Sequence, residues 1–428
     1  MAEKKISELT AKGATVADTD LIVISEVDGA SYVSKRITGA NVKALVTDAN
    51  LVTSDITTND VSTTKHGFVP KAPNNTTTFL RGDGTWAAPA AGGLTQFVEA
   101  ENTAAPNATV PVDSLSASGA ATNIDVAIVP KGTGAFMLDI PDNTATGGNK
   151  RGARAVDLST TRGAADRVAS GADSINMGTD STASGALSIA LNGNGFGVSS
   201  LGVQGGTASS TRGVAIGNNA TASGLQALCI STYTTATASG NYSVALMSGT
   251  ASGQFSMAVG ESATASGGND FAFGYRASTQ SIRARQSRGH AFSVSGDCQK
   301  SEFFLSKRTT NDTATTVTVE GGTAGTGNQV ILSNQSAYRF KGTIVGKQSG
   351  SVNAAVWDID GFIVRGANAA ATTLNVSNVT LVENTPAWGT PTLAADTTNG
   401  GLRVQVIGAA ATNIQWTAVI ETTEVIYA

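Results

Sequence analysis

Two pairs of acidic side chains near the C-terminal end have the residue type that glycoside hydrolysis requires. Asp358 and Asp360 lie two positions apart, and Glu421 and Glu424 lie three apart. Hydrolysis of a glycosidic bond normally uses two carboxyl groups roughly 5–10 Å apart. In a strand, Asp358 and Asp360 would share one face at about 6.5 Å. Gly361 follows, so we interpret both pairs as surface or turn side chains and expect no catalytic residue.

Aromatic side chains in the same part of the chain could stack on sugar rings, because they offer rigid amphipathic contact area. Trp357 and Trp416 lie inside alternating apolar runs, which predicts that they belong to a core. Trp388 lies in the proline-flanked segment 385–391, and loops carry binding residues more often than strands do. We therefore take Trp388 as the best single contact candidate, with Tyr338 as a second.

Four arginines crowd into thirteen residues and are followed by His290: Arg276, Arg283, Arg285 and Arg288. Arginine binds carboxylates and phosphates in a bidentate manner, so this cluster could form a belt that contacts acidic sugars or phosphates. The alternative is structural, with these arginines at the join of two domains and pairing between chains. We favour the structural interpretation.

Metal and nucleophile chemistry has few possible members. The chain contains two histidines, His66 and His290, and two cysteines, Cys229 and Cys298. Two cysteines cannot build a disulfide framework, and free thiols fit synthesis in a reducing cytosol. We expect Cys229 to be an inert core thiol and His66 to lie in a turn. The sequence assigns no metal site and no cofactor, and it leaves open whether an ion binds on the axis of a trimer.

The composition of the chain limits the kinds of protein that can carry these side chains. Of 428 residues, 14% are charged and 5% aromatic, 49 are glycine, and the formal net charge is −4. This balance argues against nucleic-acid binding. The chain has no run of 18 apolar residues, so we expect no membrane span, and its polar start does not resemble an export signal. A chain so poor in charge must cover its surface with Ser, Thr and Asn, or bury it against copies of itself.

A Ser-Gly dipeptide recurs between 167 and 279, in a segment that lacks proline from 142 to 385. It starts at Ser170, Ser184, Ser223, Ser239, Ser252 and Ser266. A period of 13–16 residues suffices for one coil of a β-solenoid or β-roll. We expect the inward positions to alternate Ala with Val, Ile, Leu or Met. Residues 168–275 contain five charged side chains, which predicts that the roll packs a flank on symmetry-related copies.

The two ends of the chain predict other β structure. Strands are expected at 21–25 and 31–37 around a turn at Asp28-Gly29, followed by a short helix at 41–46. A turn is expected at Asp83-Gly84, and short strands at 124–129 and 136–140. Beyond 301, strand-like runs with tight turns predict an antiparallel sandwich or jelly-roll-like module. These runs lie at 315–319, 329–332, 338–345, 354–359, 362–365, 402–407 and 414–423.

Four segments resemble proteins of tailed-phage fibres. Lys5-Ile-Ser-Glu-Leu9 with Asp20-Leu-Ile-Val-Ile-Ser25 resembles their attachment modules. Gly67-Phe-Val-Pro-Lys-Ala-Pro73 with Phe79-Leu-Arg-Gly-Asp-Gly-Thr-Trp86 resembles a connector of the same proteins. The Ser-Gly repeats resemble the heads of trimeric autotransporter adhesins, and the C-terminal segment resembles a terminal module of phage fibres. The resemblance implies a parallel homotrimer with its N-terminus on the virion and its C-terminus distal.

The resemblance leads to a prediction in four parts. We expect a virion attachment module at 1–65, a connector and shaft at 66–166, a β-roll at 167–300 and a distal β-domain at 301–428. The expected fold is mainly β, in an elongated parallel homotrimer made in the host cytoplasm and carried on the virion.

The expected function is host attachment by binding a surface glycan or another receptor through the distal part, with Trp388, Tyr338 and Arg365 as contacts. Partners are two further copies, a baseplate, tail or capsid protein, and the receptor, without nucleic acid or membrane insertion. No reaction is expected. A capsid fibre and a polysaccharide-depolymerising tailspike are the alternatives.

Overall fold

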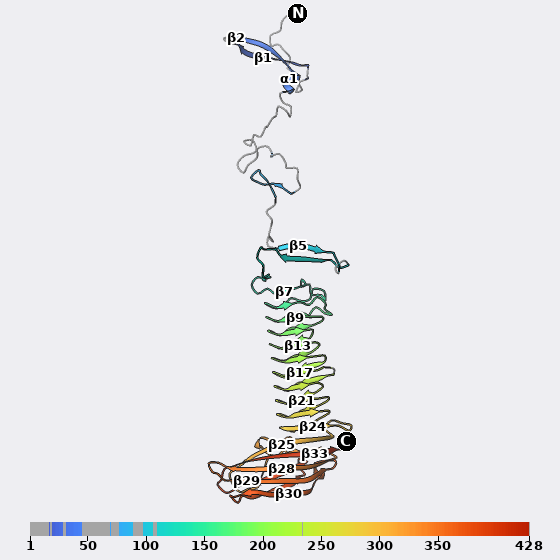
Figure 1. Ribbon diagram of the computed structural model, residues 1–428, viewed down its shortest axis with the longest axis vertical. Coiled ribbons are helices and arrows are strands. Elements are labelled where there is room, and N and C mark those ends of the chain that lie inside the picture. Colours follow the sequence, from blue (N-terminus) through green and yellow to red (C-terminus); the bar gives the residue numbers. More distant parts are fainter. Residues whose placement is uncertain are drawn as a thin grey trace. The chain divides into compact units, whose positions relative to one another are not determined.

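The computed structural model describes residues 17, 19–28, 31–44, 69, 77–88, 97–105, 109–232 and 234–427. The chain divides into two compact units, Met1–Ala127 and Ile128–Ala428, which are described separately. The fold is nearly all β (Figure 1). The segment 5–9 of the expected attachment module and the turn expected at His66 lie outside the described residues.

Three hairpins lie among the residues of the first unit that the structure describes. Strand β1 (Leu21–Asp28) pairs antiparallel with β2 (Ser31–Thr38), which confirms the predicted hairpin, and helix α1 (Gly39–Ala44) follows. Strand β3 (Phe79–Leu80) pairs with β4 (Trp86–Ala87) across the predicted turn, where Asp83 Oδ1 accepts a hydrogen bond from the Thr85 N–H at 3.1 Å. Strand β5 (Phe97–Asn102) pairs with β6 (Val112–Ala117). The strand predicted at 124–129 does not form, and that prediction is wrong.

The second unit begins with a β-solenoid, residues 136–290, which we call the coil stack. Seven of its coils contribute one strand to each of two parallel sheets, and the others contribute a strand to the first sheet alone. The first sheet contains β7 (Phe136–Met137), β8 (Val156–Asp157), β9 (Ile175–Met177), β11 (Ile189–Leu191), β13 (Leu201–Val203), β15 (Val214–Ile216), β17 (Leu228–Ile230), β19 (Val244–Leu246), β21 (Met257–Val259), β23 (Phe271–Gly274) and β24 (Arg285–His290).

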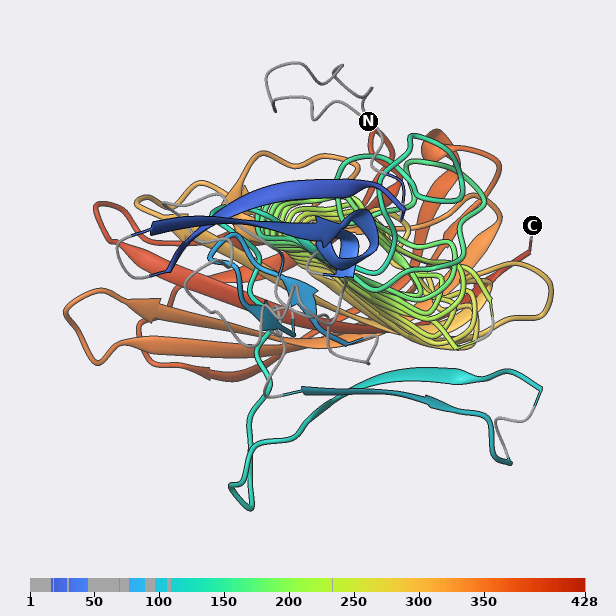
Figure 2. The same cartoon turned by 90° about the horizontal axis from the view of Figure 1, so that it is seen from above.

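The second sheet is seven-stranded and joins successive coils in the same register. It contains β10 (Thr182–Ala183), β12 (Asn194–Gly195), β14 (Thr207–Ala208), β16 (Ala220–Ala222), β18 (Ala236–Ala238), β20 (Thr250–Ala251) and β22 (Thr264–Ala265). Viewed from above, the coils superimpose (Figure 2). The predicted solenoid is confirmed.

The Ser-Gly corners explain the repeat. A Cβ on Gly240 would lie 1.9 Å from the Gly253 carbonyl oxygen of the next coil, and a Cβ on Gly185 would lie 2.0 Å from that of Gly197. No real side chain tolerates such a distance, so glycine is required wherever one coil's corner stacks on the next.

The interior of the coil stack is lined by alanine. In each three-residue strand of the first sheet the middle residue is buried, as for Ala215, Ala245 and Ala258. The expectation that Val, Ile, Leu and Met alternate with Ala in the interior is wrong, because the interior has room only for small side chains and the aliphatic ones point outward. Cys229 occupies one of the alanine positions, and burial raises the pKa of its thiol, as expected for an inert core cysteine.

The coil stack continues without a break into a terminal domain, residues 298–427. Strand β24 pairs parallel with β23 and antiparallel with β25, so one sixteen-stranded sheet runs through both parts. Its terminal strands are β25 (Cys298–Thr309), β33 (Ile414–Ile426), β28 (Ser336–Gln348), β29 (Ala354–Arg365) and β30 (Thr372–Asn384).

A smaller antiparallel sheet packs over the inner face of these five strands. It contains β26 (Thr315–Thr316), β27 (Val330–Ile331), β31 (Gly389–Asp396) and β32 (Gly401–Ile407), and the short helices η3 (Val319–Gly321) and η4 (Ala369–Ala371) complete the domain. The two sheets enclose one hydrophobic core, which includes Trp357 and Trp416 with their ring centres 6.0 Å apart. The predicted antiparallel sandwich and the core positions of both tryptophans are confirmed.

One local prediction is wrong in this domain. The runs at 354–359 and 362–365 form a single strand, β29, rather than two strands around a turn. Gly361 lies inside this strand rather than in a turn. Glycine is required there because a Cβ would lie 2.4 Å from the Phe340 ring.

Candidate functional site

The outer face of the five-stranded terminal sheet carries a shallow hollow of about 480 Å³. Charged and hydroxyl side chains of β28, β29 and β33 line it: Arg339, Lys341, Thr343, Asp358, Asp360 and Glu421. They share one face because side chains alternate along each strand, and register places Lys341 opposite both Asp360 and Glu421. We call this hollow the terminal hollow.

Every carboxylate of the terminal hollow has a partner. Glu421 lies 3.0 Å from Lys300 Nζ and 3.2 Å from Lys341 Nζ, and the hydrogen bonds from these two lysines lower the pKa of its carboxyl. The Asp360 carboxylate lies 2.9 Å from the Arg339 guanidinium, and Asp358 accepts a hydrogen bond of 2.9 Å from the Thr343 hydroxyl. The face therefore presents fixed acceptors and donors of both charges, a set that suits polyhydroxylated or charged ligands.

The carboxylate pairs of the sequence separate into two groups. Asp358 and Asp360 share the outer face, as their spacing predicts, and Glu421 joins them from β33. Glu424 lies three positions further on, so it points to the opposite side and is buried. It pairs there with Arg285 and accepts a hydrogen bond of 3.0 Å from the Gln299 amide. The alternation of side chains along a strand is enough to predict that Glu421 and Glu424, three positions apart, lie on opposite faces of the sheet.

Two of the three predicted receptor contacts are buried, which corrects that prediction. Trp388 is 6% exposed and packs edge-on against Trp416, with 5.5 Å between ring centres. Its loop folds inward because the Asn384 amide bonds both the N–H and the carbonyl of Trp388, at 2.9 and 2.8 Å. Tyr338 is fully buried, and desolvation raises the pKa of its hydroxyl.

Arg365 keeps some exposed surface. Its Nη1 donates to the carbonyl oxygens of Leu332 and Gly400, at 2.6 and 3.2 Å. This arginine therefore ties the end of β29 to the smaller sheet, and its contact with a receptor stays a prediction.

The arginine cluster does not form a belt. Arg285 is buried, with Nε donating to the Ser301 hydroxyl at 3.0 Å and the guanidinium 5.2 Å from the centre of the Phe303 ring. Together with Glu424 it locks the last coil to the terminal domain within one chain. Arg276 donates to the Ser293 carbonyl oxygen at 2.8 Å, and Arg283 pairs with Glu320 at 3.1 Å.

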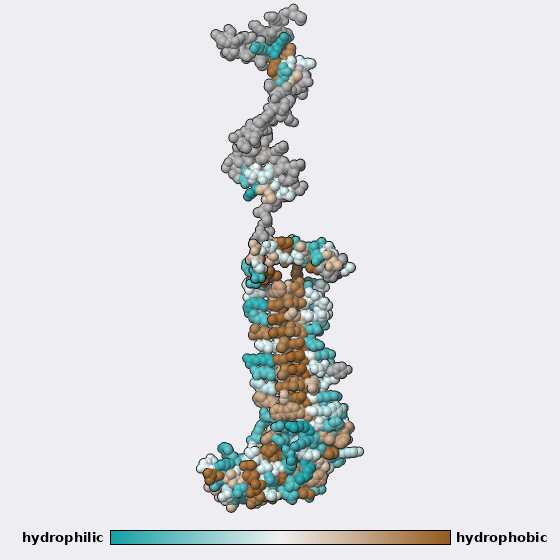
Figure 3. Space-filling view, viewed as in Figure 1, coloured by the Kyte–Doolittle hydropathy of each residue, from teal (hydrophilic) through white to brown (hydrophobic). Residues whose placement is uncertain are grey.

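The coil stack exposes a column of apolar side chains, which we call the apolar stripe. It consists of the first and third residues of the first-sheet strands β9, β11, β13, β15, β17, β19, β21 and β23, for example the partly exposed Val244 and Leu246 around the buried Ala245. Figure 3 shows the stripe as a continuous brown column along the stack. Exposed apolar surface of this extent marks an interaction site.

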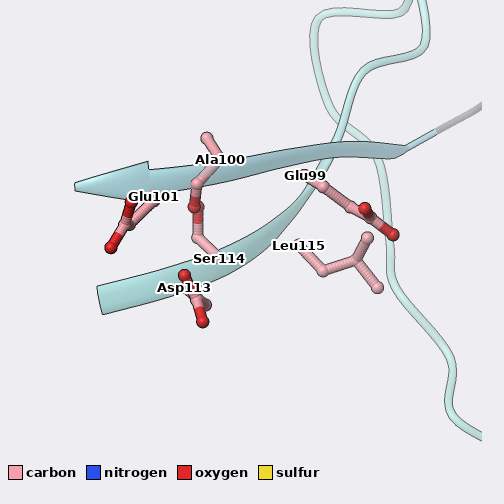
Figure 4. A pocket seen from close by; sticks show the side chains of 6 residues that line it. All are labelled: Glu99, Ala100, Glu101, Asp113, Ser114 and Leu115. Carbon is pink, nitrogen blue, oxygen red and sulfur yellow. The ribbon is translucent and has the colours of Figure 1, made fainter. Parts of the chain in front are cut away.

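A further hollow, also about 480 Å³, lies on the hairpin β5–β6 of the first unit. Figure 4 shows its lining, in which Glu101 lies opposite Asp113 and Glu99 opposite Leu115. Like charges directly across a strand pair repel each other. Among the described residues, no group of three His, Cys, Asp or Glu side chains is placed to hold a metal ion, and no helix is long and apolar enough to cross a membrane.

The coil repeats match a known family model. The model of the YadA head domain repeat matches residues 208–228 and 251–277. No curated protein matches the chain.

Two solved tailspikes are similar in part. The tailspike protein gp49 of Acinetobacter baumannii bacteriophage Fri1, a capsular polysaccharide depolymerase, shows 11% identity over 55% of this chain and 40% of its own, with a TM-score of 0.22. The tailspike of Acinetobacter phage vB_ApiP_P1 shows 10% identity over 59% of this chain and 50% of its own, with a TM-score of 0.20. This chain thus spans half or less of both tailspikes.

This comparison corrects one expectation. The sequence predicts that the chain catalyses no reaction, yet a similar solved structure is that of a depolymerase. We therefore withdraw the prediction that the chain catalyses no reaction.

Proposed function

We propose that the chain forms a homotrimeric phage fibre that attaches the virion to a host surface. The observation that carries this proposal is the apolar stripe on the coil stack, because a sheet face of Val, Ile, Leu, Met and Phe needs a cover. Further copies of the same chain suit it, since the coils are in register and 168–275 carries five charged residues. The match to an adhesin head repeat supports this occupant.

The terminal domain is the part we assign to the receptor. It buries its own core, so its outer face is free of the packing role that the stripe has, and the terminal hollow offers paired carboxylates and cations. Three such sites per fibre and several fibres per particle would raise avidity well above the affinity of one site. A glycan is the receptor class that we favour.

The four-part division also belongs to this proposal, with virion attachment at 1–65, connector and shaft at 66–166, roll at 167–300 and distal domain at 301–428. A capsid fibre of the same architecture remains an alternative. A capsular depolymerase is the second alternative, and the outward carboxylates Asp358, Asp360 and Glu421 would then be the groups to test.

Competition with purified chain tests the attachment. Excess full-length protein is added to host cells before the phage, and adsorption is measured by counting free particles. We expect the wild-type chain to block adsorption and the double variant Arg339→Ala, Lys341→Ala to block it at least tenfold less well. Lys347→Ala, on the same strand outside the terminal hollow, serves as the control. Equal blocking by all three proteins would overturn the assignment of the terminal hollow.

The same preparations separate binding from hydrolysis. Spotted on a host lawn, a depolymerase gives a halo, whereas a binding fibre gives none. A halo that disappears in Asp358→Asn with Asp360→Asn would replace the attachment proposal by the depolymerase.

A further inference from the structure

A separate hollow of about 490 Å³ lies where the last coils meet the terminal domain. We call it the junction groove. Side chains and backbone of two coils form one wall, and an ion pair forms the other. The residues on which the argument rests are Gln254, Phe255, Gly268, Asn269, Arg283 and Glu320.

The junction groove has an aromatic platform. Phe255 stacks on Tyr242 of the preceding coil, with ring centres 4.9 Å apart and planes inclined by 11°. Both rings stay at the surface, 49% and 41% exposed. Tyr242 covers one face of the Phe255 ring, and Phe255 lines the groove together with Asn269, which holds the same corner in the following coil.

Folding does not explain these two aromatic residues. They occupy a corner of the coil with left-handed backbone, at φ of 59° for Tyr242 and 55° for Phe255. The same left-handed corner in other coils holds Leu187, Ser199, Arg212, Gln226 and Asn269, so the backbone conformation belongs to the repeat itself. What sets this point apart is that two successive corners carry aromatic rings, which stack on each other at the surface. In a chain that is 5% aromatic, two stacked rings at one exposed point indicate a ligand contact.

Polar groups surround the platform. Arg283 Nη1 lies 3.1 Å from Glu320 Oε2, and both side chains are more than half exposed, at 57% and 53%. Next to the ring, the floor of the groove is open, because a Cβ on Gly268 would meet only the Gln254 carbonyl oxygen, at 3.8 Å. The groove thus combines one apolar ring face, two amide side chains and a neutralised ion pair.

We propose that the junction groove binds a pyranose ring of a neutral oligosaccharide. The apolar face of the sugar lies on Phe255, the Glu320 carboxylate accepts from its hydroxyls, and Arg283, Gln254 and Asn269 donate to its oxygens. An apolar surface with a few convergent polar groups is the general form of a small-ligand site. Because Arg283 and Glu320 neutralise each other, an uncharged sugar fits better than an acidic one. This site goes beyond the proposed attachment, which uses the terminal hollow.

Binding of free sugars tests the groove without any host cell. Full-length chain is screened by saturation-transfer NMR against malto-, cello-, manno-, galacto- and chito-oligosaccharides, and binders are titrated by calorimetry. We expect saturable binding of at least one sugar. Phe255→Asn should raise its Kd at least tenfold, since asparagine already occupies this corner at Asn269. Gly268→Leu should abolish binding by filling the floor.

The matched control is Leu187→Asn, which changes an exposed apolar residue at the same left-handed corner (φ 57°) in another coil and should leave Kd unchanged. The proposal is overturned if no sugar in the panel binds, if Phe255→Asn binds as tightly as wild type, or if binding is lost in the Arg339→Ala, Lys341→Ala variant instead. It is also overturned if Phe255→Asn changes the scattering mass of the assembly, because the ring would then face another chain. If the wild-type chain binds a sugar but fails to block phage adsorption to host cells, the groove stands and the result counts against the attachment proposal alone.

Discussion

The coil stack and the terminal domain are one continuous sheet built in two ways. The stack has an interior of alanine methyl groups, glycine corners and an apolar outer stripe. The terminal domain encloses three tryptophans and turns most of its charges outward, Glu424 and Asp396 being buried. The stack therefore gains stability from backbone repetition, whereas the domain gains it from its own core. The difference teaches that one sheet can pass from a part that leaves its aliphatic side chains outside to a part that encloses them.

The largest effect should come from a methyl group in the glycine column. Gly240→Ala would place a Cβ 1.9 Å from the Gly253 oxygen, so the coils must separate and the ladder breaks on both sheets. We expect a loss of roughly 4 kcal/mol or more in the free energy of unfolding, at the upper end for point substitutions. Thermal unfolding followed by circular dichroism measures it. Gly82→Ala, with no atom near its Cβ, is the control, and an equal melting temperature for both would contradict the stacking argument.

The next effect should be confined to the terminal domain. Trp416→Ala removes a fully buried indole that contacts Trp357 and Trp388 and donates through Nε1 to the Thr309 hydroxyl at 2.9 Å. Large-to-small changes of this kind cost about 3–5 kcal/mol. Hydrogen exchange should show faster exchange in the terminal strands and unchanged protection around Ala245. Equal loss in both parts would show that the stack depends on the domain as well.

A charge on the apolar stripe should affect assembly rather than the fold of one chain. Val244→Glu places a carboxylate among exposed aliphatic side chains, and burying it against a second copy would cost several kcal/mol without a partner. We expect light scattering to report the mass of three chains for wild type and of one chain for the variant. Thr237→Glu, in the second sheet of the same coil region, should keep the wild-type mass. A wild-type mass of one chain would refute the trimer outright.

The smallest effect concerns a buried carboxyl in the last full coil. Asp270 accepts from the Gly267 N–H at 2.8 Å and from the Thr279 hydroxyl, and burial raises its pKa. A raised pKa in the folded state contributes stability below the pKa of the unfolded state, and that stability is lost as pH rises through the folded value. The melting temperature of wild type should therefore fall modestly from pH 4 toward pH 7 relative to that of Asp270→Asn. Parallel pH profiles for the two proteins would contradict this.

The sequence predicts the solenoid and the sandwich because both have local periodic signals. The Ser-Gly period reports the stacked corners, and alternation in runs such as 402–407 reports strands. It does not predict which way the aliphatic residues of Val244-Ala-Leu246 point, since a period of two is satisfied by either face. The width of the interior decides, and width is a property of the stacked coils.

The candidate sites depend on contacts between distant parts of the chain. Arg285 and Glu424 are 139 positions apart, and nothing in either segment predicts their pairing. Trp388 is buried because the Asn384 side-chain amide holds its backbone, and the proline-flanked sequence around Trp388 does not predict these hydrogen bonds. The junction groove left a weak signal, because alignment of the repeats places two aromatic residues, Tyr242 and Phe255, at a corner where the other aligned coils have none. Its second wall, at Glu320, could not be foreseen.

The orientation of the hydrogen-bond ladder has a mechanical consequence. Bonds between successive coils run from one parallel strand to the next, so they lie mainly along the stacking direction with the slant of a parallel ladder. Tension applied along that direction acts in full on every coil boundary, and the bonds of one boundary share it, so the strength of the whole stack under pulling equals that of its weakest boundary. The buried Arg285–Glu424 pair adds an ionic contact at the boundary with the terminal domain. Under traction, we expect rupture to begin between coils and the terminal domain to stay attached to the last coil.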